Sequence, residues 1–309
     1  MSDQPLVSIL INNYNYGAFL SESIESALNQ TYRHREIIVV DDGSTDNSRD
    51  IIEKYSGRII TVLKENGGQA SALNGGFAKS KGDILCFLDS DDYFFSQKVE
   101  VIVELFRQIT GNDSIQNNTM IYHLLQIVSK DGSDRDGTIP SQLFDREANL
   151  LCYARKYRFV PYSASPTSGL SISRSLAAQI FPIPESITVS ADDFVVRASS
   201  LLGSVRGDNR CLAAYRVHGD NKWHGSTTRK SPEFMSALEE YLNNKLRERN
   251  LTPVIDFQRS MYAREYTSPS FIAYNKLAFD VLVHCCDLTT LKFFLRTQLL
   301  ALKCLVGKI

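Results

Sequence analysis

The sequence predicts an α/β fold, a mostly parallel sheet with helices on both faces, followed by a helical C-terminal extension. In the first hundred residues, apolar runs of strand length alternate with segments of helical periodicity, which is typical of βαβ units. The apolar runs are continuous rather than alternating, which indicates a sheet covered on both faces. Helical spacing dominates from residue 231 onward, so we expect a main domain over 1–225 and a helical region over 226–309.

Four strands and three helices are expected in the first part of the chain. The apolar runs place the strands at residues 6–11, 36–40, 58–63 and 83–88. Apolar spacing predicts a helix over 18–29, and the turn GSTDNS predicts a capped helix over 44–55. The small-residue stretch 66–82 predicts a third helix that ends at Gly82.

The pattern becomes less regular after this region. A helix is expected over 97–109, a strand over 120–129, a polar hairpin-like loop over 130–137 and helical spacing over 145–157. Residues 168–176 predict a strand entering a short helix, and Pro182 and Pro184 interrupt the chain before an amphipathic helix over 189–203. Residues 211–219 predict one more strand, running into a loop.

Composition excludes several classes of protein. With 34 basic and 35 acidic residues, the net charge of −1 argues against a broadly basic nucleic-acid binder. The six cysteines are scattered without C-x-x-C spacing, which favours free thiols in a reducing compartment over disulfides or zinc. We read neither a signal peptide nor an apolar run long enough to span a membrane, so a cytoplasmic location is expected.

Acidic residues gather where the predicted strands end. Asp41 and Asp42 end the second strand, and Asp89, Asp91 and Asp92 follow the fourth. Two unit charges about 4 Å apart repel by roughly 4 kcal/mol at an effective dielectric of 20, so a cation is expected to neutralise the second group. Hard cations such as Mg²⁺ and Mn²⁺ take such oxygen ligands together with substrate phosphates. The alternative is a solvated turn after a strand.

Polar and aromatic residues follow the first strand. Tyr14 suits stacking on a planar heterocycle, and the amides of Asn12, Asn13 and Asn15 suit its edges. One carboxylate of the group DDGSTD (41–46) can accept an N–H from a base such as uracil. The alternative is a turn with a half-buried tyrosine. Within 66–76, Asn74 is the expected side-chain contact to a ligand, with close helix-to-sheet packing as the alternative. Neither a phosphate loop of the G-x-x-x-x-G-K type nor G-x-G-x-x-G follows strand one.

Seven sequence blocks occur in order over residues 5–222: VSILINNYN, SALNQTY, EIIVVDDGSTD, NGGQASALNGG, GDILCFLDSDD, ADDF and YRVHGDN. Together they resemble glycosyltransferase family 2, whose members are inverting enzymes of the GT-A fold that use nucleotide-diphosphate sugars. The resemblance implies a nucleotide-sugar-dependent glycosyltransferase domain over 1–225. It implies transfer from a nucleotide-diphosphate sugar, with uridine favoured and thymidine an alternative, to a hydroxyl of a glycan or other acceptor.

The resemblance also implies roles for individual residues. Tyr14 would stack on the base, Asp42 would meet its edge, and Asn12 would lie in the same pocket. Asp89 would contact the ribose or diphosphate side, with Ser90 beside it. Asp91 would ligate the Mg²⁺ or Mn²⁺ ion, with His218 near the metal or diphosphate.

The ADDF block would supply the catalytic base. Many relatives have Glu-Asp there, whereas here Ala191 precedes two aspartates. Asp192 is favoured because its position after Ala191 matches the Ala-Asp form of the block, with Asp193 as the alternative. Acceptor contacts are expected from 120–190, with Ser168 and Gly169 as candidates, and the setting would be surface polysaccharide or glycan synthesis. A sugar nucleotidyltransferase and a non-catalytic nucleotide-sugar-binding relative are the rival interpretations.

The stretch 288–309 has basic residues and no acid among its apolar ones. Its basic residues are Lys292, Arg296, Lys303 and Lys308. An amphipathic helix of this composition can lie on an anionic membrane surface. Alternatively, it packs on the main domain or forms a homo-oligomer with the same helix of a second subunit.

Overall fold

A single large sheet organises the computed structural model, which describes residues 4–110, 118–140, 149–160, 164–219, 221 and 232–257. Its strand order is β3-β2-β1-β4-β8-β6-β9-β5, with β7 paired to β6. The strands are β1 (Val7–Asn13), β2 (Arg35–Asp42), β3 (Ile60–Lys64), β4 (Ile84–Asp89), β5 (Tyr93–Phe94), β6 (Thr119–Val128), β7 (Asp134–Ile139), β8 (Leu170–Ser173) and β9 (Ser204–Arg216). The helices are α1 (Gly17–Leu28), α2 (Ser48–Glu53), α3 (Gly68–Lys79), α4 (Lys98–Thr110), α5 (Leu151–Tyr157), α6 (Arg174–Ile180), α7 (Ala191–Leu202) and α8 (Pro232–Glu248), with a 3₁₀ turn η1 (Thr167–Gly169).

The first half of the sheet is parallel, as predicted. Strand β1 pairs in parallel with β2 and β4, and β2 pairs in parallel with β3. The register sets Asn12 beside Asp89 and Asn13 beside Asp41. The polar residues that end three separate strands therefore meet at one edge of the sheet.

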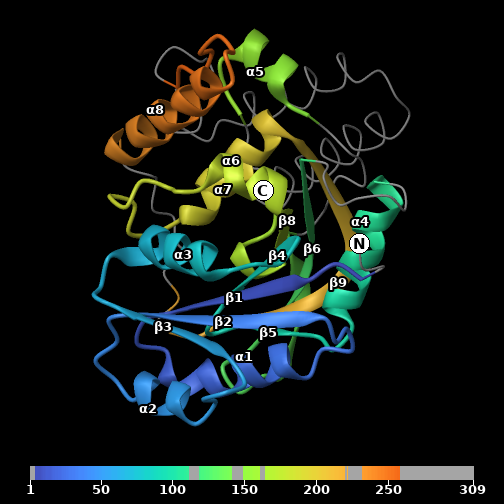
Figure 1. The fold of residues 1–309 in the computed structure, drawn as a ribbon, viewed down its shortest axis with the longest axis vertical. Coiled ribbons are helices and arrows are strands. Elements are labelled where there is room, and N and C mark those ends of the chain that lie inside the picture. The colour runs from blue at the N-terminus through green and yellow to red at the C-terminus, as the bar shows by residue number, and fades with distance from the viewer. Residues whose placement is uncertain are drawn as a thin grey trace, which may run out of the picture.

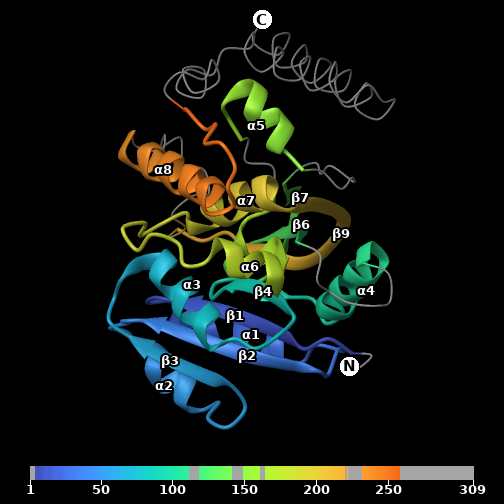
Figure 2. The same ribbon diagram turned by 45° about the horizontal axis from the view of Figure 1, so that its top comes forward.

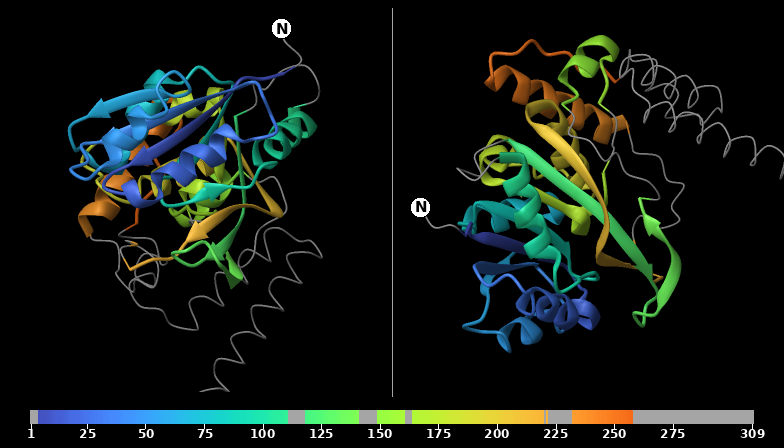
Figure 3. Two further views of the ribbon diagram at one scale, coloured as in Figure 1. Left: turned by 90° about the horizontal axis from the view of Figure 1, so that it is seen from below. Right: turned by 90° about the vertical axis from the view of Figure 1, so that its right-hand side faces the viewer.

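The second half is mixed. Strand β8 is antiparallel to both β4 and β6, whereas β6 and β9 run parallel along most of their length (Figure 3). Strands β5 and β7 were not predicted, and β9 begins at Ser204 rather than at residue 211. The start of β9 is polar and only partly buried, so its pairing with β6, rather than its own hydrophobicity, makes it a strand.

Side chains that alternate along the strands divide the interior into two cores. On one face, Leu10 and Phe87 pack with α3, α5, α6, α7 and α8; on the other, Ile9 and Leu88 pack with α1, α2 and α4. Figure 1 shows α3, α6 and α7 on one side of the sheet and α1 and α2 on the other. Because both faces are covered, β1 and β4 are buried along nearly their whole length.

Helix α8 packs onto the same layer as α5 and α7 (Figure 2). Leu238, Tyr241 and Leu242 are buried in the same core as α7, so residues just past the predicted boundary at 225 share the interior of the main domain. The basic stretch 288–309 lies outside the described residues. In the described part of the chain, the helices are all too short or too polar to cross a membrane. The cysteines described there, Cys86, Cys152 and Cys211, are free, as predicted.

Candidate active site

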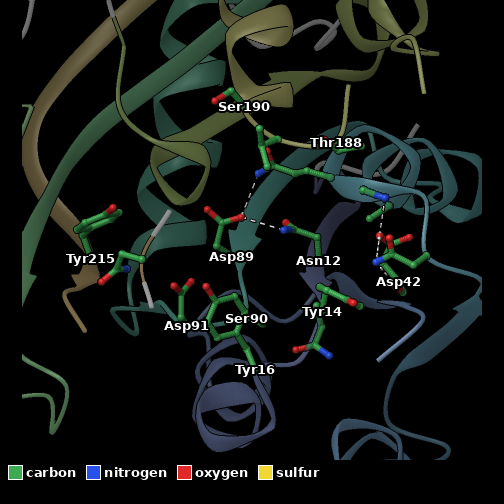
Figure 4. Close-up of a pocket in the computed structure, with 17 residues that line it drawn as sticks. Asn12, Tyr14, Tyr16, Asp42, Asp89, Ser90, Asp91, Thr188, Ser190 and Tyr215 are labelled. Carbon is green, nitrogen blue, oxygen red and sulfur yellow. Dashed lines mark hydrogen bonds between the residues drawn. The ribbon is translucent and has the colours of Figure 1, made fainter. Parts of the chain in front are cut away.

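A cavity of about 250 Å³ opens at the carboxyl ends of β1, β2 and β4. The predicted residues that line it are Asn12, Tyr14, Asp42, Asp89, Ser90 and Asp91. Figure 4 shows Asp42 and Tyr14 toward one end, Asp91 and Tyr215 toward the other, and Asp89 between them. Thr188 and Ser190, from the loop before α7, also line it. Parallel α/β sheets bind ligands at this edge, so the cavity is the candidate active site.

The carboxylate of Asp42 is held rigidly at its end of the cavity. Lys64 Nζ lies 2.6 Å from Asp42 Oδ1. The backbone N–H groups of Gly67 and Gly68 donate to the two carboxylate oxygens at 3.0 and 2.7 Å. The side-chain amide of Asn66 donates to Oδ2 at 3.3 Å. The start of α3 therefore fixes the orientation of this acid.

Tyr14, Asn12 and Ser90 offer groups that a ligand can use. Tyr14 is 40% exposed, so its ring is accessible for stacking. The amide of Asn12 donates to Asp89 Oδ1 at 2.9 Å, which leaves Asn12 Oδ1 buried and without a hydrogen-bond partner among the described residues. The hydroxyl of Ser90 is also buried and has no hydrogen-bond partner among the described residues. Because buried polar atoms are usually satisfied, these two atoms can accept a hydrogen bond from, or donate one to, water or a ligand in the cavity.

Asp41, adjacent to Asp42, has a structural role. Its carboxylate is buried and accepts hydrogen bonds from Asn13 Nδ2 at 3.1 Å and from the backbone of Ser44 at 3.1 Å. Arg49 Nε donates to it at 3.0 Å. These bonds anchor the loop after β2, so only the second acid of the pair faces the cavity.

The electrostatics of Asp89 reflect crowding by other acids. Burial, with the charges of Asp91 and Asp192, raises the pKa of Asp89 to about 7 against the opposing effect of the hydrogen bond from Asn12. The repulsion between neighbouring carboxylates that we expected from the sequence therefore contributes to the raised pKa of Asp89.

Asp92, the third acid of the turn, is turned away from the cavity. It is buried, accepts a hydrogen bond from Ser168 Oγ at 2.6 Å, and accepts another from the backbone of Arg216 at 2.9 Å. Burial and the charges of Asp91 and Asp89 raise its pKa well above the usual range. Asp92 therefore ties the turn to η1 and β9.

Asp91 and His218, the predicted metal ligands, lie together. His218 Nε2 is 3.0 Å from Asp91 Oδ2, and the imidazole stacks on Phe19 and meets the edge of Tyr16, with ring centroids 4.9 and 5.5 Å away. The described residues contain no group of three or more His, Cys, Asp or Glu side chains arranged to hold a metal ion. Asp91 and His218 alone would give a cation only two ligands, so a cation held there would need further oxygen ligands, such as those of a substrate.

The two candidate bases, Asp192 and Asp193, have different environments. Asp193 is fully buried and accepts a charge-assisted hydrogen bond from Arg197 Nε, and Arg197 also donates to the backbone oxygen of Val160. Asp192 is half-buried in the first turn of α7, and its charge raises the pKa of Asp89. Asp193 is thus tied to Arg197, whereas Asp192 does not line the cavity but lies near enough to Asp89 to affect its pKa.

Three expected contacts are corrected by the structure. The amide of Asn74 exchanges two hydrogen bonds of 2.8 Å with the backbone of Ile183, so it joins α3 to the segment after α6 and does not line the cavity. Ser168, proposed for the acceptor, is fully buried against Asp92. Gly169 is also buried, and a Cβ there would lie 2.3 Å from Ser165 Cβ, which accounts for the glycine.

Gln69 and Tyr215 line the cavity, although they were not singled out from the sequence. Tyr215 precedes the arginine of the YRVHGDN block, and burial and the charges of four nearby aspartates raise its pKa. Gln69 lies inside NGGQASALNGG. Both residues lie within the sequence blocks that resemble glycosyltransferase family 2, so membership of those blocks was the signal that could have pointed to them.

Comparison with known proteins identifies related sequences. Residues 8–124 match the family model described as glycosyl transferase family 2. An uncharacterized glycosyltransferase of Nostoc sp. (strain PCC 7120) is 32% identical over 275 residues, which cover 84% of this chain and 81% of the relative. The glycosyltransferase GlyG of Streptococcus pneumoniae serotype 4 is 40% identical over 113 residues, 35% of this chain and 36% of GlyG.

The fold is similar to solved structures of S. aureus TarS. For residues 1–349 of TarS in complex with UDP, the TM-score is 0.58 at 19% identity, covering 88% of this chain and 78% of that one. For the complex with UDP-GlcNAc, the TM-score is 0.54 at 18% identity, covering 94% and 81%. The comparison confirms the predicted GT-A class of α/β fold.

Proposed function

Because this chain belongs to glycosyltransferase family 2, we propose that it moves a sugar from a uridine-diphosphate sugar to a hydroxyl of a glycan acceptor, with inversion of the anomeric carbon. The observation that carries the proposal is the separation of roles on α7. Asp193 is buried in an ion pair, whereas Asp192 remains half-buried near the acids of the cavity. Asp192 is therefore the acid that we assign as the single base of an inverting reaction.

The donor would bind with its base at the Asp42 end. Tyr14 is accessible for stacking, and the fixed carboxylate of Asp42 can accept the N3–H of uracil if one of its present donors yields. That UDP and UDP-GlcNAc are bound by structurally similar TarS supports a uridine donor. Asp89 and the unsatisfied atoms of Asn12 and Ser90 lie farther along and would meet the ribose and diphosphate.

A divalent cation such as Mg²⁺ or Mn²⁺ fits the far end, with Asp91 and His218 as the residues that would hold it. Their ligand atoms lie 3.0 Å apart. The described lining of the cavity contains three carboxylates and no lysine or arginine, so a diphosphate needs positive charge that these side chains do not supply. When bound, the cation would stabilise the charge that develops on the leaving diphosphate.

In the proposed reaction, Asp192 accepts the proton of the acceptor hydroxyl as its oxygen attacks the anomeric carbon. The bond between that carbon and the diphosphate oxygen breaks, and UDP leaves with the electron pair. Attack from the face opposite UDP inverts the configuration. The acceptor in this proposal is a growing glycan, as in surface polysaccharide synthesis.

The decisive experiment compares the wild type with Asp192→Asn over a panel of nucleotide sugars and glycan acceptors. We expect UDP affinity to be retained and turnover to fall by about 10²- to 10⁴-fold, the usual contribution of a general base, or roughly 3 to 5 kcal/mol of barrier. Near-normal turnover in this variant would remove Asp192 from the role. NMR of the product's anomeric proton tests inversion directly.

Two rival functions make different predictions in the same panel. A sugar nucleotidyltransferase would exchange labelled pyrophosphate into a nucleotide sugar, whereas the proposed enzyme releases UDP and exchanges none. A non-catalytic relative would bind the donor and never release free UDP, even at high protein concentration. Release of UDP without pyrophosphate exchange therefore supports the proposal against both.

A further inference from the structure

Gln69 connects two parts of the site that the proposed function uses separately. It lies in the first turn of α3, and its side-chain Oε1 accepts the backbone N–H of Ala191 at 3.0 Å. Its Nε2 donates to Thr167 Oγ1 at 3.2 Å and, at a longer 3.5 Å, to Asp89 Oδ1. One amide thus contacts the carboxylate at the centre of the cavity and the first residue of the helix that carries Asp192.

The segment before α7 depends on α3 for its position. The backbone N–H groups of Gln69 and Ala70 donate to Thr188 and Ile187 at 3.0 and 3.3 Å. Ser190, which precedes α7, has a φ of 57°, and its side chain does not cap the helix, although its carbonyl oxygen accepts the Asp193 N–H. The side chain of Gln69 bonds the first residue of α7 directly, through the Ala191 N–H.

We propose that Gln69 is a positioning residue that sets the place of Asp192 relative to Asp89 by holding the N-terminus of α7. This inference rests on the proposed function, in which Asp192 is the base. Gln69 would then affect proton removal from the acceptor rather than binding of the donor. A residue that serves only general stability would change both in proportion to the loss of folded protein.

The test uses Gln69→Met, which preserves side-chain length and removes both polar groups. The matched control is Gln179→Met, because Gln179 is also a half-buried helical glutamine and its amide bonds with Asn118 and Ser175 instead. The measurements on the full chain are kcat, donor KM, UDP affinity and the thermal unfolding midpoint.

We expect Gln69→Met to lower kcat by about 10- to 100-fold, since a displacement of about 1 Å in a reacting group can cost about 100-fold. UDP affinity should stay within about twofold of the wild type. Gln179→Met should leave kcat unchanged. If Gln69→Met loses UDP affinity as much as kcat, the inference is overturned.

A double-mutant cycle separates this inference from the proposed function. If Gln69 acts through Asp192, then Gln69→Met should add no more than about twofold to the loss already caused by Asp192→Asn, because coupled residues are not additive. Multiplying losses would overturn the inference and leave the base assignment intact. Normal turnover in Asp192→Asn alone would overturn the base assignment and the inference together.

Discussion

Single residues on α7 show how position decides between catalysis and stability. Asp193 and Arg197 are both buried and form an ion pair one helical turn apart. Removing one member of such a pair leaves an uncompensated buried charge, which typically costs about 3–5 kcal/mol. We therefore expect Asp193→Asn to lower the free energy of unfolding by an amount in this range, measured by urea denaturation.

The matched comparison for that variant is Asp192→Asn, a change of the same chemistry one position earlier. It should leave the unfolding free energy within about 1 kcal/mol, because Asp192 is only half-buried. Equal destabilisation by the two substitutions would show that the environments of the two acids do not differ as described.

His123 gives the fold a dependence on pH. It is fully buried on β6, and burial, with the nearby charge of Lys98, lowers its pKa to about 3. In the unfolded chain a histidine has a pKa near 6.5, so the unfolded state binds the proton first. Stability is fully present above about pH 6.5 and is lost as pH falls toward about 3, by at most about 1.4 kcal/mol per unit.

Urea denaturation between pH 7 and pH 5 measures this slope. His123→Gln should flatten it, whereas His34→Gln, at an exposed histidine, should leave it unchanged. A slope that is the same in all three proteins would mean that burial of His123 does not drive the dependence.

The candidate residues at strand ends line the cavity, as expected from the sequence, whereas Asn74 on α3 does not. Asn12, Asp42 and Asp89 were predictable because the ends of parallel strands meet at one edge. The contacts of Asn74 were not predictable, because packing against the sheet decides which face of α3 points toward the cavity. A Cβ on Gly76 would lie 2.7 Å from Leu10 Cδ2, so this face of α3 lies against β1, and Asn74 bonds with Ile183 instead of a ligand.

At the scale of elements, the junction between α3 and the loop before α7 depends on a glycine. Gly68 has a φ of +83°, and a Cβ there would lie 2.4 Å from Thr188 Cα. Its N–H also donates to Asp42. We expect Gly68→Ala to destabilise the protein and to weaken UDP binding, measured by denaturation and calorimetry.

A substitution at Gly57 is the control that separates the cost of backbone strain from the cost of a steric clash. Its φ is +78°, yet an added Cβ would meet nothing within 4 Å. Gly57→Ala should therefore cost only the strain, about 1–3 kcal/mol for a left-handed residue, and should not change UDP affinity. Losses of stability that are equal in the two variants would exclude the proposed clash between Gly68 and the loop.

The elements themselves were predictable only where local pattern determines them. Strands β1, β2 and β4 are buried along most of their length and appear as continuous apolar runs in the sequence, whereas the edge strand β3 is largely exposed. Strand β5 has only two residues, and it exists because Tyr93 and Phe94 pair with Ala214 and Ala213, far away in the chain. Pairing of this kind leaves little signal in the local sequence.

For the whole molecule, we expect the donor and a cation together to stabilise the fold. A ligand present at 100 times its Kd adds about 2.7 kcal/mol to the free energy of unfolding. Because the described cavity lining is acidic, UDP should bind more tightly with Mn²⁺ than without it. Calorimetry and thermal unfolding, with Mn²⁺ and with EDTA, measure both effects.

Asp91→Ala should abolish the gain from Mn²⁺, whereas Asp208→Ala should retain it, because Asp208 pairs with Arg210 away from the cavity lining. An equal gain from Mn²⁺ in the wild type and in Asp91→Ala would remove Asp91 as a ligand.

The last strand of the sheet has a consequence for synthesis of the protein. Strand β9 pairs with β6 and β5, and it brings Tyr215 to the cavity and Arg216 to the acidic turn. A nascent chain emerging from the ribosome therefore exposes Asn12, Asp42 and Asp89 long before the strand that completes their pocket. The complete pocket therefore cannot form until synthesis has passed the end of β9.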